Sequence, residues 1–113
     1  MASYAFAVPV LLGKSGAARR IAAEVSGPRR SEADEFQRRV GITKQMVWLQ
    51  QTSQGDISIV YLEADDPGRL FQELASSDKP FDRWYRQQLK EVHGLDLTQP
   101  PPPNELIFEW QGT

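Results

Sequence analysis

The sequence predicts a single α+β domain in which a four-stranded antiparallel sheet carries its helices on one face. Stretches typical of strands alternate along the chain with stretches that have the apolar spacing of helices. The predicted strands are apolar on both faces, so both faces of the sheet need a cover. A short polar turn, formed by Ser53, Gln54 and Gly55, joins the two clearest strands into a hairpin.

The size and composition are those of a small soluble domain. With 113 residues the chain forms one domain, residues 1–113, and a partner subunit would add to its modest core. The apolar run at residues 4–12 is too short to cross a membrane and follows no positively charged segment, so we expect a cytoplasmic protein that does not contact a membrane. The 13 basic and 15 acidic residues are nearly balanced, which argues against a nucleic-acid partner.

The first predicted strand, residues 4–12, contains Pro9. Proline has no N–H to donate within a central strand, so we expect a bulge or an unpaired position there. The Gly-Lys-Ser sequence that follows resembles the end of a phosphate-binding loop, but Val8 stands where that loop needs a glycine. We therefore expect Ser15 to cap a helix instead.

Residues 15–40 have the apolar spacing of helices. Gly27 and Pro28 interrupt the pattern, so one kinked helix and two abutting helices both fit, and Gly41 ends the element. The expected buried positions are Ala18, Ile21, Ala22, Val25, Ala33, Phe36 and Val40.

The hairpin strands are predicted at residues 42–52 and 56–64. Because side chains alternate between the faces of a strand, each strand divides into two sets. On the first strand, one face carries Met46, Trp48 and Gln50, and the other carries Val47 and Leu49. On the second strand, Ile57, Ile59, Tyr61 and Glu63 alternate with Ser58, Val60 and Leu62.

Two further helices are predicted after the hairpin. A short one opens with Asp66 as its cap and Pro67 in its first turn. The main one lies within residues 78–96, and its apolar stripe consists of Phe81, Trp84, Tyr85, Leu89 and Val92. Asp82 and Arg86 are four positions apart, so we expect them to pair on its outer face.

The chain ends in a proline-rich segment and a last predicted strand. Residues 98–104 are expected to be an extended, stiff spacer, an interpretation favoured over a ligand for an aromatic groove on another protein. Residues 105–111 have the composition of a strand. This strand can pair with its own sheet or be exchanged with that of a neighbouring molecule.

The order strand, helix, strand, strand, helices, strand is that of the ferredoxin-like split βαβ fold. Helices would then cover one face of the sheet only, although both faces are apolar. A bare apolar face would form an exposed patch of roughly several hundred Å², which monomers avoid. The sequence therefore predicts a homodimer packed sheet to sheet.

This layout resembles that of the dimeric α+β barrel superfamily, in which two ferredoxin-like subunits pack their sheets into a barrel. Three stretches are similar to those of small, uncharacterised bacterial proteins with the same layout: VWLQQT at residues 47–52, YLEADDP at 61–67 and FDRWYRQQLKEVHGLD at 81–96. The superfamily includes cofactor-free monooxygenases, isomerases, haem enzymes, stress proteins and ligand-binding regulators, so the resemblance alone selects no function.

The resemblance implies a small-molecule pocket, and it leaves three functions open. The first is chemistry on a small aromatic or polyketide-like molecule, similar to that of the cofactor-free monooxygenases. The second is a non-catalytic ligand-binding or stress-related dimer. The third is a structural protein that docks through its proline run or its last strand.

The candidate catalytic residues are His93 and Tyr61. His93 is the single histidine, and its ordinary pKa near neutrality suits a general acid or base. We expect Tyr61 or Glu63 to lie within reach of it across the fold, and Asp96, three residues on, to orient it. The competing interpretation is that His93 caps the C-terminus of its helix, where positive charge is favourable.

The candidate ligand-binding residues combine aromatic walls with polar tips, as small-molecule pockets do. They are Trp48, Gln50, Glu63, Trp84 and Arg83. The competing interpretation is core packing with hydrogen bonds at an interface. Glu63 ends an otherwise apolar strand and needs a partner, for which Arg83 and Arg86 are the candidates.

No metal site and no cofactor is expected. The absence of cysteine and the single histidine argue against structural zinc and against a haem ligand. Asp65 and Asp66 resemble paired metal-binding carboxylates, but helix capping alone accounts for Asp66. The sequence contains no nucleotide, flavin or pyridoxal motif.

Overall fold

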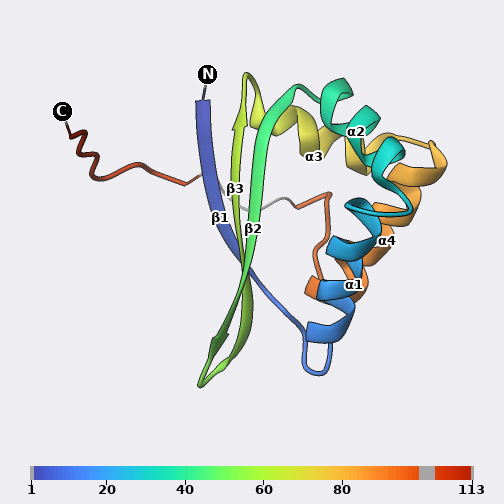
Figure 1. Ribbon diagram of the computed structural model, residues 1–113, viewed down its shortest axis with the longest axis horizontal. Coiled ribbons are helices and arrows are strands. Elements are labelled where there is room, and N and C mark those ends of the chain that lie inside the picture. The colour runs from blue at the N-terminus through green and yellow to red at the C-terminus, as the bar shows by residue number, and fades with distance from the viewer. Residues whose placement is uncertain (1, 100–103, 113) are drawn as a thin grey trace.

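A computed structural model describes residues 2–99 and 104–112 of the chain. Within these residues the chain has an α+β architecture, with three antiparallel strands and four helices on one side of the sheet (Figure 1). In chain order the elements are β1 (Ala2–Pro9), α1 (Ser15–Val25), α2 (Arg30–Arg39), β2 (Ile42–Thr52), β3 (Gly55–Ala64), α3 (Pro67–Ser76) and α4 (Pro80–His93).

The sheet has the order β1-β3-β2, so β3 pairs antiparallel with both of its neighbours. β1 and β2 are joined through α1 and α2 and run parallel, with β3 between them. Pro9 pairs with Ile57 in regular register at the last position of β1, so the expectation of a bulge or an unpaired position is wrong. Because β1 lies at an edge of the described sheet, a residue without an N–H is tolerated there.

The expected fourth strand is not formed in this structure. Residues 104–112 have no regular secondary structure, and their side chains are exposed where the structure describes them. The prolines at positions 100–103, the centre of the expected spacer, lie outside the described residues. The observed sheet therefore has three strands, and the complete ferredoxin-like arrangement remains a prediction.

The helices cover one face of the sheet and leave the other bare, as expected (Figure 1). The covered face carries the alternate residues of β3 that are buried, namely Ser58, Val60, Leu62 and Ala64. Their neighbours in the sequence point to the bare face, where Trp48 of β2 keeps 49% of its surface exposed. The core therefore lies between the sheet and the helices.

Local signals account for most helix ends. The interruption at Gly27 and Pro28 separates two helices, so the two-helix alternative for residues 15–40 is confirmed. Asp66 caps α3 by accepting the Gly68 N–H at 3.1 Å. The expected cap at Ser15 is wrong, because Lys14 holds the cap position and the Ser15 hydroxyl donates to the Asp56 carboxylate.

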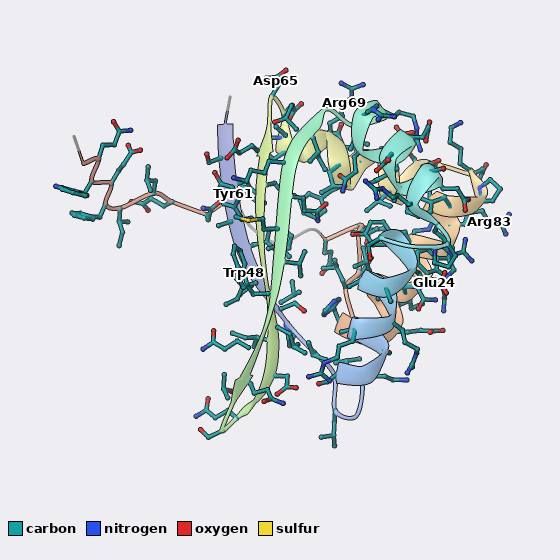
Figure 2. The ribbon with its side chains drawn as sticks, in the orientation of Figure 1. Glu24, Trp48, Tyr61, Asp65, Arg69 and Arg83 are labelled. Atoms are coloured by element: carbon teal, nitrogen blue, oxygen red, sulfur yellow. The ribbon has the colours of Figure 1, made fainter. Side chains whose placement is uncertain are left out.

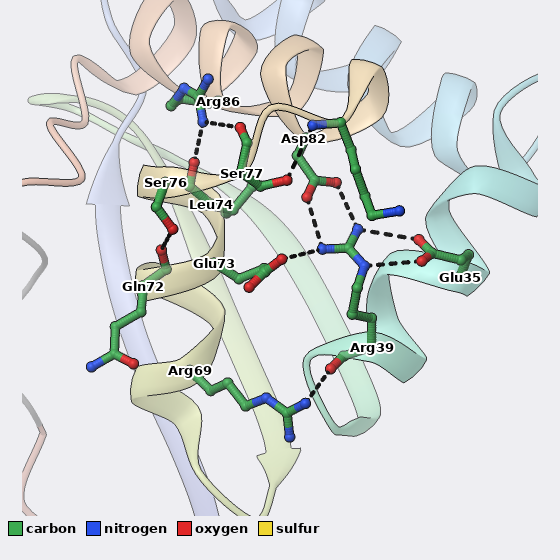
Figure 3. A network of polar contacts seen from close by, with 11 residues as sticks. Glu35, Arg39, Arg69, Gln72, Glu73, Leu74, Ser76, Ser77, Asp82 and Arg86 are labelled. Carbon is green, nitrogen blue, oxygen red and sulfur yellow. Dashed lines mark hydrogen bonds and ion pairs between the residues drawn. The ribbon is translucent and has the colours of Figure 1, made fainter.

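The expected pair between Asp82 and Arg86 on an outer face is also wrong. Asp82 is fully buried and faces Arg39 of α2, whose Nη1 and Nη2 donate to its two carboxylate oxygens at 2.9 and 3.0 Å (Figure 3). Arg86 instead donates to the backbone carbonyls of Leu74 and Ser77. Asp82 thus pairs with Arg39 on another helix and not with Arg86, four positions along its own helix. Only the contact with Arg39 satisfies the carboxylate inside the core.

Arg39 also binds carboxylates on two other sides. Its Nε and Nη2 donate to Glu35 at 2.9 and 3.1 Å, and Nη1 donates to Glu73 of α3 at 2.6 Å. The hydrogen bond from Arg39 lowers the pKa of Glu35. One guanidinium thus joins α2, α3 and α4 (Figure 3).

Replacing Arg39 with methionine is expected to destabilise the fold by about 3–5 kcal/mol, because it leaves the Asp82 carboxylate buried without a partner. Urea unfolding measures the change. Arg39→Met combined with Asp82→Leu should recover much of the loss, since both charges are then removed. Arg38→Met is the matched control at an exposed neighbour and should stay within about 0.5 kcal/mol of the parent. A loss no larger than that of the control would show that the pair does not hold the helices together.

Candidate functional site

A cavity of about 280 Å³ lies between the sheet and the helices. Its volume is close to the lower end of the range for ligand pockets, about 300–1,000 Å³. The lining is mostly apolar and comes from both layers, with Phe6, Val8 and Val60 from the sheet and Ile21, Val25 and Leu89 from the helices. The cavity is therefore suited to a small apolar molecule.

Helix α1 borders this cavity without burying any residue. Its apolar stripe, which includes Ile21 and Val25, faces the cavity. A helix of this kind normally obtains most of its stability from burying such a stripe. Packing of α1 is therefore incomplete in the chain alone, and an apolar molecule in the cavity would complete it.

Three polar side chains meet at one part of the cavity wall. The Nε2 of Gln37 on α2 donates to the Oε1 of Gln45 on β2 at 2.6 Å. Tyr85 of α4, whose pKa is raised by burial, is hydrogen-bonded to Gln45 in turn. The Oε1 of Gln37 is buried and accepts no hydrogen bond from any described residue. An unsatisfied buried acceptor of this kind costs about 1–3 kcal/mol, which a ligand donor would recover.

His93 also lines the cavity, at the end of α4. Its Nδ1 is 2.8 Å from the Pro9 carbonyl oxygen, which can only accept, so Nδ1 carries the hydrogen. Burial lowers the pKa of His93, although the hydrogen bond to Pro9 acts in the opposite direction. The ring is therefore neutral at neutral pH, and Nε2 has a free lone pair.

The two polar regions of the cavity lie apart along α4. Tyr85 and His93 are eight positions apart on that helix, which corresponds to about 12 Å along its axis. A molecule that contacts both regions has to be elongated. The intervening wall offers mainly apolar contacts.

Trp48, Gln50, Tyr61 and Glu63 all lie on the bare face of the sheet, opposite the helices. The Tyr61 hydroxyl donates to Glu63 Oε2 at 2.6 Å and lies 3.3 Å from the Ser3 hydroxyl oxygen. Glu63 therefore has a partner on its own strand. The structure does not bring Tyr61 and His93 together, because the sheet lies between them.

Arg83 and Trp84 lie on α4, in the helix layer. Arg83 is exposed on the helix layer, away from Trp48 and Tyr61 (Figure 2). Trp84 stacks under the guanidinium of Arg29 at 4.2 Å from the ring centroid, and it packs against Phe81. Both residues of α4 therefore belong to the outer part of the helix layer. Asp96, expected to orient His93, binds Thr98.

Sequence reasoning missed Gln37, Gln45 and Ser58 as residues of the cavity wall. A signal for two of them is present in the alternation of the strands. Gln45 shares a face with Val47, and Ser58 shares a face with Val60, so each is a polar residue on an otherwise apolar face. Gln37 has no such signal, because its role depends on which strand lies beneath α2.

Comparisons with known proteins add no assignment: no family model, no curated protein and no solved structure matches this chain. Across the described residues, no group of three or more acidic, histidine or cysteine side chains is arranged to hold a metal ion. No helix in the same residues is long and apolar enough to cross a membrane. The geometry of the cavity and of the two sheet faces is therefore the basis for assigning a function.

Proposed function

We propose that the protein binds a small, mainly apolar organic molecule with a hydroxyl group in the cavity between α1 and the sheet. The observation that carries the proposal is the buried, unsatisfied Oε1 of Gln37 in an otherwise apolar wall. A ligand hydroxyl would donate to this oxygen, while the rest of the ligand would cover Ile21 and Val25. Binding would thus satisfy the unpaired Gln37 oxygen and complete the packing of α1.

The test compares 1-naphthol with naphthalene, which has the same rings without the hydroxyl. The parent protein is expected to bind 1-naphthol about tenfold more tightly, since one hydrogen bond contributes about 1–1.5 kcal/mol. Gln37→Leu should abolish this preference, and Gln72→Leu, which removes an exposed amide on α3, should retain it. Titration calorimetry measures the six affinities, those of the three proteins for each of the two compounds. Equal affinities in the parent, or no binding of either compound, would contradict the proposal.

The second part of the proposal is that two copies pack through their bare sheet faces. This face combines the exposed side chains of Met46 and Trp48 with Ile57, Ile59 and Tyr61 at its centre. Sheets that pack face to face bury such side chains in a layer about 10 Å thick. The same surface, left in water, would be an exposed apolar patch of a size that monomers avoid.

Trp48→Glu is expected to convert the dimer into a monomer, because it places a charge at the centre of the paired sheets. The matched control is Leu12→Glu, the same kind of change at a fully exposed loop residue, which should leave the dimer intact. Light scattering after size-exclusion chromatography at about 10 μM measures the mass of each species. A monomeric parent protein at this concentration would exclude the proposed dimer.

An alternative function, cofactor-free oxygenation, is favoured by the neutral His93 at the cavity wall. In this alternative the hydroxyl of 1-naphthol lies at the His93 end of the cavity and not at Gln37. Nε2 of His93 would take its proton, and the resulting anion would reduce O₂. One oxygen atom would join the ring to give a naphthoquinone, and the other would leave as water with the two hydrogens lost by the substrate. The base of this reaction is the neutral imidazole.

Oxygen uptake with 1-naphthol is therefore expected to decline as the pH falls below the lowered pKa of His93, because the protonated ring has no lone pair. His93→Gln should abolish uptake and leave the affinity for 1-naphthol within about threefold of the parent. An oxygen electrode records the rates. If the parent and His93→Gln consume oxygen equally, binding without catalysis is the remaining function.

A further inference from the structure

Among the described residues, no strand lies beside the outer edge of β1. The Val10 N–H donates to the Asp56 carbonyl, and in an antiparallel pair the residues that bond to the neighbour alternate. Ser3, Ala5 and Ala7 therefore direct their N–H and C=O groups away from β3. The edge ends at Pro9, which has no N–H and whose carbonyl accepts from His93. Within the described part of the chain, β1 thus presents a short edge without a neighbouring strand, of the kind that recruits another strand.

The C-terminal segment has the properties of the missing strand. Leu106, Phe108 and Trp110 alternate with polar or charged residues except at Ile107, and these four apolar side chains are 73–86% exposed. Alternation of this kind is typical of a strand that buries one face. In Figure 1 the segment extends away from the sheet, on the side opposite the helices. Exposed apolar side chains grouped in this way mark a site of interaction.

The path of the chain argues against pairing within one molecule. Helix α4 ends beside Pro9, since His93 binds the Pro9 carbonyl and Leu11 donates to the Val92 carbonyl. The chain does not continue along the β1 edge from this end, because Leu97 is buried in the core between the sheet and the helices. Residues 98–104 follow, and their prolines at positions 100–103 have no N–H for a ladder.

The described part of the tail lies away from its own β1 edge. Residues 104–112 form no strand, and Figure 1 shows them extending from the sheet on the side opposite the helices. The same segment is free to reach an edge on another molecule.

We propose that residues 105–111 of each molecule add as an antiparallel strand to the β1 edge of a second copy, so that two chains exchange their C-terminal strands. The inference rests on the proposed dimer, whose bare sheet face adjoins this edge. Each exchanged strand would satisfy the outward backbone groups of Ser3, Ala5 and Ala7. It would also remove Phe108 and Trp110 from water.

Disulfide formation distinguishes exchange from pairing within one chain. The protein has no cysteine, so Ala5→Cys is combined in the full chain with Ile107→Cys, Phe108→Cys or Glu109→Cys, one at a time, to sample the register. Opposed residues of paired strands have Cα atoms within the range that a disulfide bridges. Mild oxidation at about 10 μM is followed by gel electrophoresis without reductant.

Two control variants calibrate the experiment. Ala5→Cys with Tyr61→Cys joins residues that are opposed within one sheet, and it should give a bond inside one chain. Ala5→Cys with Arg19→Cys places the second thiol on the exposed side of α1 and should give no bond above background. These variants show that cysteine at position 5 reacts and that random collisions do not account for a product.

A covalent dimer from at least one tail position is the expected result. A tail bond inside one chain would show pairing with its own sheet and would overturn the exchange. No bond from any tail position, with both controls behaving as expected, would overturn it as well. A monomeric parent would overturn the dimer and the exchange together.

Truncation separates the exchange from the sheet-to-sheet contact. A variant that ends at Gln99 is expected to raise the dissociation constant of the dimer at least about tenfold, because the strand and its apolar contacts are lost. Trp48→Glu acts on the other contact and leaves the C-terminal strand in place. A truncated protein that dimerises as tightly as the parent would overturn the exchange and leave the proposed sheet-to-sheet dimer standing.

Discussion

The contact on which the helix layer depends is the bidentate pair between Arg39 and the buried Asp82. A carboxylate in the core is tolerated only when its charge and its hydrogen bonds are both satisfied. The contact that meets this requirement joins α2 to α4, and Glu73 of α3 binds the same guanidinium. The rings of Phe36, Phe81 and Tyr85 then pack next to this pair, with centroids 5.7–5.9 Å apart. Three of the four described helices are therefore held by charge as well as by apolar contact.

Helix α1 binds Asp56 through Ser15 in its first turn but has no buried ion pair of this kind among the described residues, and it forms one wall of the cavity. The tightly joined helices carry Gln37 and Tyr85 at one end of the wall, and α4 carries His93 at the other. The mobile or exchangeable part of such a site is expected to be the element with the fewest buried contacts. Rigid positioning of the polar groups on α2 and α4, together with a less constrained α1, is a favourable arrangement for admitting a small ligand.

The two faces of the sheet separate the proposed ligand site from the proposed assembly surface. Sequence reasoning placed Tyr61 and His93 in one site, because both are chemically versatile and no local signal showed the sheet between them. Strand alternation correctly predicts that Tyr61, Glu63 and Trp48 share one face. Alternation does not predict which of the two faces the helices cover, because both faces are apolar. The packing of α2, α3 and α4 against the sheet decides which face is covered.

By itself the sequence determined the features that depend on neighbouring residues: the hairpin at Gly55, the break between α1 and α2, the cap at Asp66 and the end of α4 at Gly94. Each arises from steric or hydrogen-bonding preferences within a few positions. Only the tertiary structure decided that Asp82 pairs with Arg39, that Gln37 binds Gln45 and that His93 binds the Pro9 carbonyl at the end of β1. These contacts join residues from different elements. They form because a buried polar group binds the partner that the packed elements bring to it, and the spacing of residues along the chain does not specify that partner.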